Sequence, residues 1–221
     1  MDYERAAMNA FSDAFPGIKM DGCLFHLTKN MRKHLGDHHL LTRYGNDGEF
    51  ALNARKIISL AFLPPTRIED ALLHLEDTLP QDLIPILSWF EDNYVGRPTR
   101  SGRRQPALFP IVMWSVYART KDGTDRTNNY SEAAHRRIQA EFQMQHPTIW
   151  KFIDALRQVQ ASRDTAYEAM VRGDPPPKKR KLYQLIDERL LRIITNFDES
   201  EPDGNIEEFL RRCAHNFQMD P

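Results

Sequence analysis

A carboxylate and an imidazole stand one helical turn apart in the segment Arg126–His135. Glu132 and His135 are separated by three positions, and the Thr-Asn-Asn run ahead of them is typical of a helix N-terminus. The sequence therefore predicts a helix over residues 128–143 with both groups on one face. On that face His135 could orient Glu132, contact DNA or pack half-buried.

Cys23 and His26 form a second pair with chemical potential. Cys-x-x-His can supply two ligands of a zinc site, but a closed site needs two more, and the other pair, Cys213 and His215, lies far along the chain. We therefore expect no zinc, and interpret Cys23 as buried with His26 packed nearby. The run Asp37–His39 is also rich in ligand types, but its successive residues point different ways, so we interpret it as a polar turn.

Basic residues gather in short stretches. The segment 96–110 contains Pro and Gly and no acidic residue, which predicts a surface loop. Arginine forks suit phosphate oxygens, so the loop could bind DNA; the alternative is an ordinary solvated loop. Arg136 and Arg137 add to the DNA interpretation, and Lys178–Lys181 resembles a nuclear localisation signal. The loop arginines are Arg97, Arg100, Arg103 and Arg104.

The segments that must position these groups are predicted to be mostly helical. A capping box of Thr66 and Glu69 predicts a helix start, and the Pro64-Pro65 pair predicts a helix end. One strand is expected, over Ile18–Phe25. The expected helices cover 3–15, 26–35, 47–60, 66–75, 83–94, 128–143, 148–171, 182–194 and 206–217.

Composition is that of a globular intracellular chain. The 221 residues are 41% hydrophobic and 28% charged, with a net charge of −1, so overall charge predicts no partner. Two cysteines fit a reducing compartment, and the N-terminus lacks the basic and then apolar start of a signal peptide. We expect a nuclear or intracellular location and no membrane partner.

Five phrases in a fixed order resemble the later part of a Mutator-like element (MULE) transposase domain. The first begins at Asp2 as Asp-Tyr-Glu-Arg-Ala-Ala, and the second contains Cys23 and His26. One phrase alone would be weak, whereas five in order indicate common ancestry. The phrases cover residues 2–11, 22–26, 60–65, 126–135 and 146–153.

This resemblance implies a fold class and a division of the chain. The fold would be mainly α, with an incomplete RNase H-like α/β core that keeps one or two strands. Residues 1–172 would be a partial transposase domain in which 47–117 is a helical insertion. A Pro-rich and basic linker, 173–181, would precede a helical C-terminal extension, 182–221.

The resemblance also implies a function. In the intact family, DNA phosphoryl transfer uses Mg²⁺ or Mn²⁺ held by three acids; Asp2 would match the second acid and Glu132 the third. Cys23, His26 and His135 would be accessory residues beside the site. The family's first acid precedes Asp2, so we expect this chain not to cleave or join DNA alone. Double-stranded DNA is the expected partner, and the oligomeric state stays open; the alternative is a non-catalytic helical DNA-binding or protein-interaction module.

Overall fold

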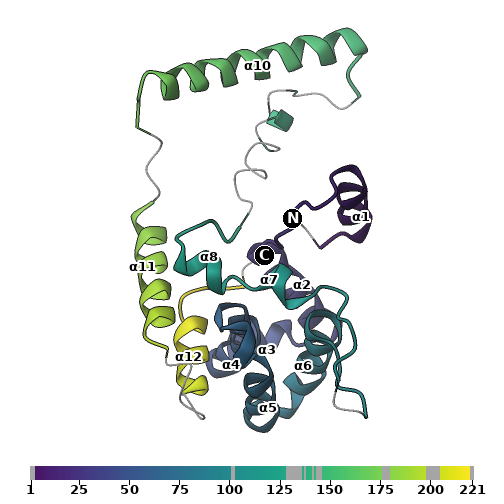
Figure 1. The fold of residues 1–221 in the computed structure, drawn as a ribbon, viewed down its shortest axis with the longest axis vertical. Helices are drawn as coiled ribbons and strands as arrows, with labels where there is room; N and C mark the ends of the chain where they lie inside the picture. Colours follow the sequence, from purple (N-terminus) through teal and green to yellow (C-terminus); the bar gives the residue numbers. More distant parts are fainter. Residues whose placement is uncertain are drawn as a thin grey trace. The chain divides into compact units, whose positions relative to one another are not determined.

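The computed structural model describes residues 3–100, 103–127, 136, 138–140, 142, 146–175, 180–197 and 205–219. Within these ranges the chain is helical, with irregular connections and no strand (Figure 1). An isolated bridge between Pro98 and Arg104 is the closest approach to sheet structure there. The expectation of a mainly α protein is therefore confirmed, whereas the RNase H-like core stays a prediction.

The elements follow one another in short helical segments, several of them single 3-10 turns. The Glu91–Val95 element is a π-helix that continues directly from α6. The elements are α1 (Arg5–Ala14), α2 (Leu24–Asp37), α3 (Leu41–Asn46), α4 (Gly48–Ser59), η1 (Leu60–Phe62), η2 (Pro65–Arg67), α5 (Ile68–Thr78), η3 (Gln81–Leu83), α6 (Ile84–Phe90), η4 (Glu91–Val95), α7 (Ile111–Trp114), α8 (Tyr117–Lys121), α10 (Ile149–Val171), α11 (Lys181–Thr195) and α12 (Ile206–Ala214).

The chain forms two compact units. The first combines Met1–Thr127 with Gln184–Pro221, and the second is Asn128–Tyr183. The larger unit therefore contains both ends of the sequence.

The core of the first unit is built around α4, which packs against α12, α3 and η1. Its buried face carries Ala54, Ile57 and Ile58, which a 3.6-residue period places together. From the C-terminal segment, α12 contributes Phe209 and Leu210 to this core. Residues 205–219, expected as part of a C-terminal extension, thus pack into the same core as the first hundred residues.

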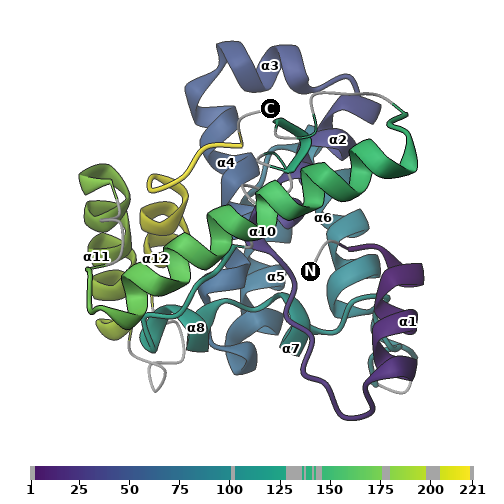
Figure 2. The same ribbon diagram turned by 90° about the horizontal axis from the view of Figure 1, so that it is seen from above.

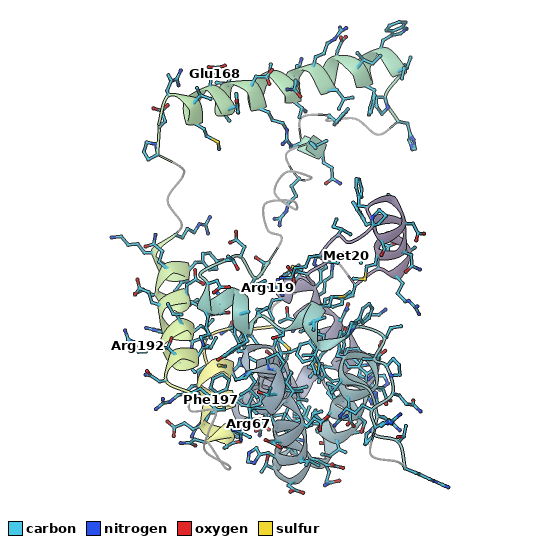
Figure 3. The ribbon with its side chains drawn as sticks, in the orientation of Figure 1. Met20, Arg67, Arg119, Glu168, Arg192 and Phe197 are labelled. Atoms are coloured by element: carbon cyan, nitrogen blue, oxygen red, sulfur yellow. The ribbon has the colours of Figure 1, made fainter. Side chains whose placement is uncertain are left out.

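The first unit also places two pairs of helices side by side. Figures 1 and 2 both show α11 beside α12, and Phe197 after α11 packs against Phe209 with ring centroids 4.7 Å apart. Arg67 extends its guanidinium over the ring of Phe197, 5.9 Å from the centroid (Figure 3). The second pair is α2 and α6, which contact each other. These contacts join segments that are remote in sequence.

The expected strand at Ile18–Phe25 is wrong. Residues 18–23 are irregular, and α2 begins at Leu24. The backbone of this segment is bonded individually instead of in a ladder: Gly22 N–H donates to the Met113 carbonyl at 2.7 Å. A buried backbone needs partners, but scattered tertiary partners satisfy it without a sheet.

The first turns of α4 and α5 differ in their caps. Asp47 caps α4 by accepting from the Phe50 N–H at 3.0 Å. The cap expected at Thr66 is wrong, because η2 includes Thr66 and Arg67 takes the N-cap position of α5. Arg67 makes no capping bond there; its Nε donates to Asp70 instead.

The second unit is described mainly by α10. Thr148 caps this helix by accepting from the Lys151 N–H at 3.5 Å. Phe152 stacks on Phe142 with centroids 5.3 Å apart. A search of the described helices, α10 included, finds none with the length and apolar character to span a membrane.

Candidate nucleic-acid interface

Two of the phrases that carry the family resemblance are hydrogen-bonded to each other. The Leu24 N–H donates to the Arg126 carbonyl at 2.9 Å, so the start of α2 is fixed to the start of the Arg126–His135 phrase. On the same stretch, Arg119 Nη2 donates to the Gly22 carbonyl at 3.0 Å (Figure 3). The backbone around Cys23 is therefore held on both sides by residues about a hundred positions later.

Tyr3, which belongs to the first phrase, contacts the same backbone segment around Gly22. A Cβ added at Gly22 would lie 2.5 Å from the Tyr3 hydroxyl, so the phenol lies directly against the glycine backbone. The ring packs edge-on against Tyr94 and Phe109, at centroid distances of 5.6 and 5.0 Å. Burial, with Tyr94 nearby, raises the pKa of Tyr3 far above its usual value. Tyr3 is thus a neutral anchor at neutral pH.

Arg126 connects this junction to two further segments. Its guanidinium forms an ion pair with Asp187 of α11, and the Arg126 side chain is only 15% exposed. The same guanidinium lies over the ring of Phe62, 6.0 Å from the centroid, and Phe62 belongs to the third phrase. We call the meeting place of Tyr3, Gly22, Leu24 and Arg126 the junction. Its residues belong to three of the five phrases, and Phe62 of a fourth phrase lies beside Arg126.

A basic helix face borders the junction. On α2, Leu27, Met31 and Leu35 are buried at four-residue spacing. The opposite face carries Lys29 and Lys33, which are exposed and have no carboxylate partner among the described residues. The burial pattern and the helical period together separate an apolar face from a cationic one.

A surface depression opens along that basic face. Its lining comes from α2 and from the residues just before α1. Asn30 is fixed within it, because its amide donates to the Tyr94 hydroxyl at 3.2 Å. Two ammonium groups, an imidazole and an amide around this hollow can donate hydrogen bonds to a phosphate, and their donors outnumber the one carboxylate there, that of Glu4. The lining residues are Tyr3, Glu4, His26, Lys29, Asn30 and Lys33.

The arginine loop is less available than its sequence indicates. Arg104 donates to Glu69 Oε1 at 2.6 Å and to Glu91 Oε1 at 2.7 Å, and its side chain is 21% exposed. Burial lowers the pKa of Arg104, but the bonds to Glu91 and Glu69 outweigh burial and raise it overall. Arg97 pairs with Asp92, with Nη2 and Oδ2 2.9 Å apart.

Two loop arginines stay accessible. Arg100 and Arg103 are exposed, and the Arg103 carbonyl accepts from the Thr99 N–H at 2.6 Å, which closes the turn. Although the stretch 96–110 contains no acid, acids from α5 and η4 reach Arg104 across the fold. We therefore leave Arg97 and Arg104 out of the interface proposed below.

Several expected site residues lie outside the described part of the chain. Arg136 is described and exposed, as are Arg180 and Lys181 at the start of α11. The residues outside the described ranges are Asp2, Glu132, His135, Arg137, Lys178 and Lys179.

The described residues do not present a metal centre. Among them, no three His, Cys, Asp or Glu side chains come together in a way that could hold a metal ion. Cys23 and Cys213 are both buried and outside any disulfide, and burial raises the pKa of Cys213 well above its usual value. Asp2 and Glu132, the acids expected to bind Mg²⁺ or Mn²⁺, lie outside the described residues.

Sequence reasoning missed Lys29 and Lys33. Their signal was present, because His26, Lys29 and Lys33 recur at three- and four-residue spacing opposite the apolar stripe of α2. Tyr3 and Gly22 gave no such signal, because only the tertiary fold brings them into contact.

No family model, no curated protein and no solved structure matches the chain.

Proposed function

We propose that this protein is a transposon-derived, DNA-binding protein, related to the later part of a MULE transposase domain. One observation carries the proposal: separate phrases of the resemblance meet at the junction, through the Leu24–Arg126 hydrogen bond and the contact of Tyr3 with Gly22.

The basic face of α2 supplies the contact with DNA. Lys29 and Lys33 are exposed one turn apart, and they border a depression beside the junction. Ammonium groups of this kind bind phosphate oxygens without reading base sequence. The exposed guanidinium groups of Arg100 and Arg103 can add further phosphate contacts.

The proposed activity is binding without strand cleavage. By the resemblance, Asp2 and Glu132 correspond to two of the three acids of the intact family. The described residues offer donors to an anion, but among them no group of three or more His, Cys, Asp or Glu side chains comes together that could hold a metal ion. Incubation of the purified chain with a supercoiled plasmid and Mg²⁺ or Mn²⁺ is expected to leave the plasmid intact; nicking that needs the metal would contradict this part of the proposal.

Salt dependence of duplex binding tests the proposal. Fluorescence anisotropy of a short labelled duplex gives the binding constant at several salt concentrations. If Lys29 and Lys33 each neutralise one phosphate, the double variant Lys29→Gln/Lys33→Gln should flatten the log–log salt slope by about 1.8.

The matched control removes the same charge elsewhere on the first unit. Lys19 and Lys121 are both exposed, and the variant Lys19→Gln/Lys121→Gln should keep the wild-type slope. Equal slopes for wild type and the α2 variant would refute the assignment of the face. Absence of duplex binding at low salt would refute DNA binding and favour the protein-interaction alternative.

A further inference from the structure

The C-terminal turn of α2 carries two imidazoles on one side of the helix. His34 lies in the last turn and His38 is the C-cap residue, four positions later. Side chains at this spacing lie one above the other on a helix. Their ring centroids are 4.7 Å apart, and the rings meet edge to face at an interplanar angle of 64°. Two imidazoles that bind one ion at about 2.0–2.1 Å per nitrogen have centroids roughly 4.5–5.5 Å apart. The two rings are therefore near enough to share an ion once the exposed His38 ring rotates to turn a nitrogen toward it.

Packing fixes one of the two rings. His34 stacks on Trp89 of α6, with centroids 4.3 Å apart and an interplanar angle of 19°. The stack occupies the face of the imidazole and leaves its nitrogens at the ring edge. Neither the His34 nor the His38 side chain forms a hydrogen bond or ion pair within the part of the chain that the structure describes, so their ring nitrogens are available.

The surroundings of the two rings act on a cation in opposite directions. The carbonyl end of a helix carries partial negative charge, and His38 is at that end of α2. Burial, and after it the neighbouring His38, lower the pKa of His34, whereas the charge of Asp37 acts to raise it. The exposed side chain of His38 leaves a path for an ion from solvent.

We propose that His34 and His38 form a two-imidazole site for a borderline divalent transition metal such as Zn²⁺, Ni²⁺ or Cu²⁺. Imidazole suits this class of ion, whereas Mg²⁺ prefers oxygen ligands. Water completes the coordination shell, since two protein ligands leave the other positions open. The site is independent of the proposed DNA binding and of the acids Asp2 and Glu132.

Titration with Ni²⁺ tests the site in the full-length chain. Ni²⁺ bound at His34 lies next to Trp89, so binding should quench the fluorescence of that indole, and Trp89→Phe should remove the quenched component. Isothermal titration calorimetry gives the same affinity by a second method. Mg²⁺ at the same concentrations should produce neither signal.

Histidine variants distinguish binding of Ni²⁺ by both imidazoles together from binding by one histidine alone. His38→Gln, at an exposed position, should weaken Ni²⁺ binding by about tenfold or more, because the second ligand of a chelate binds at high effective concentration. His34→Gln should weaken it equally, and the double variant should lose little more. The control His39→Asn removes the adjacent exposed imidazole, at a backbone φ of 58° that Asn tolerates, and should bind as wild type does.

Two outcomes would overturn the proposal. One is a His38→Gln variant that binds Ni²⁺ as tightly as wild type; the other is a His39→Asn variant that loses as much affinity as His38→Gln. Since His38 is exposed, its substitution leaves the fold in place, and circular dichroism of each variant checks this directly.

Discussion

Glu207 connects three helices of the first unit, and its replacement by Gln should destabilise that unit measurably. Glu207 lies in the first turn of α12. Its Oε1 accepts from Lys56 Nζ of α4 at 2.5 Å, and its Oε2 lies 3.0 Å from His74 Nε2 of α5. The Lys56 side chain is only 7% exposed, whereas that of Glu207 is 41% exposed.

The burial of Lys56 determines how much stability the Glu207→Gln substitution should cost. Removal of one partner from a buried ion pair costs about 3–5 kcal/mol, because the other charge is left buried. Partial exposure of Glu207 screens the pair, so we expect a smaller loss of about 1–3 kcal/mol for Glu207→Gln. The double variant Lys56→Met/Glu207→Gln should regain most of that loss, since no buried charge remains.

Glu208 provides the control. It occupies the same helical turn and is about as exposed as Glu207, but its partner Arg212 is 59% exposed, whereas Lys56 is 7% exposed. Glu208→Gln removes the same charge from the N-terminus of α12 but should cost only about 0–1 kcal/mol. Urea unfolding followed by circular dichroism measures both variants. Equal losses for Glu207→Gln and Glu208→Gln would refute the reasoning.

The pH dependence of the same variants has a definite sign. Burial raises the pKa of Glu207, but its bonds to Lys56 and His74 outweigh burial and lower the pKa below the ordinary value of 4.5. The folded state therefore binds the proton less readily than the unfolded state. The resulting stability is present above about pH 4.5 and is lost as pH falls through the lower, folded-state pKa. Glu207→Gln should remove this part of the acid dependence, and Glu208→Gln should keep it.

Three glycine substitutions probe close backbone contacts, each measured by urea unfolding. Gly22→Ala would place a Cβ 2.5 Å from the hydroxyl of Tyr3, and we expect a loss of about 1–3 kcal/mol. Gly96→Ala would meet the Gln105 carbonyl oxygen at 1.9 Å, at a backbone φ of +89°, and should cost more than Gly22→Ala. Gly45→Ala, with open space around its Cβ position, should be neutral or stabilising by about 0.5–1 kcal/mol. A Gly96→Ala variant as stable as Gly45→Ala would contradict the described path of the loop.

The parts of the fold that depend on short-range signals could be predicted from the sequence. The cap of α4 at Asp47 and the cap of α10 at Thr148 follow from residue type and the apolar period behind them. The end of the α4 and η1 region before Pro65 follows from the proline pair. In each case the deciding atoms lie within a few residues of one another.

The parts that depend on remote partners could not. The segment that ends at Cys23 has the apolar residues of a strand, but its backbone partners are Met113 and Arg126, which no local pattern announces. From the sequence, Arg104 looks like an unpaired cation, because Glu69 and Glu91 come close to it only in the folded chain. For the candidate interface, the spacing of Lys29 and Lys33 on one helix face could therefore be predicted from the sequence. The position of the junction beside them could not.

Mapping DNA contacts residue by residue tests the central claim most directly. Backbone amide signals of the isotope-labelled chain would be followed by NMR while a short duplex is added at low salt. The account predicts that the largest shifts fall on α2 around Lys29 and Lys33, with smaller shifts at Tyr3 and Arg126. Saturable duplex binding that leaves all of these signals unchanged would contradict it.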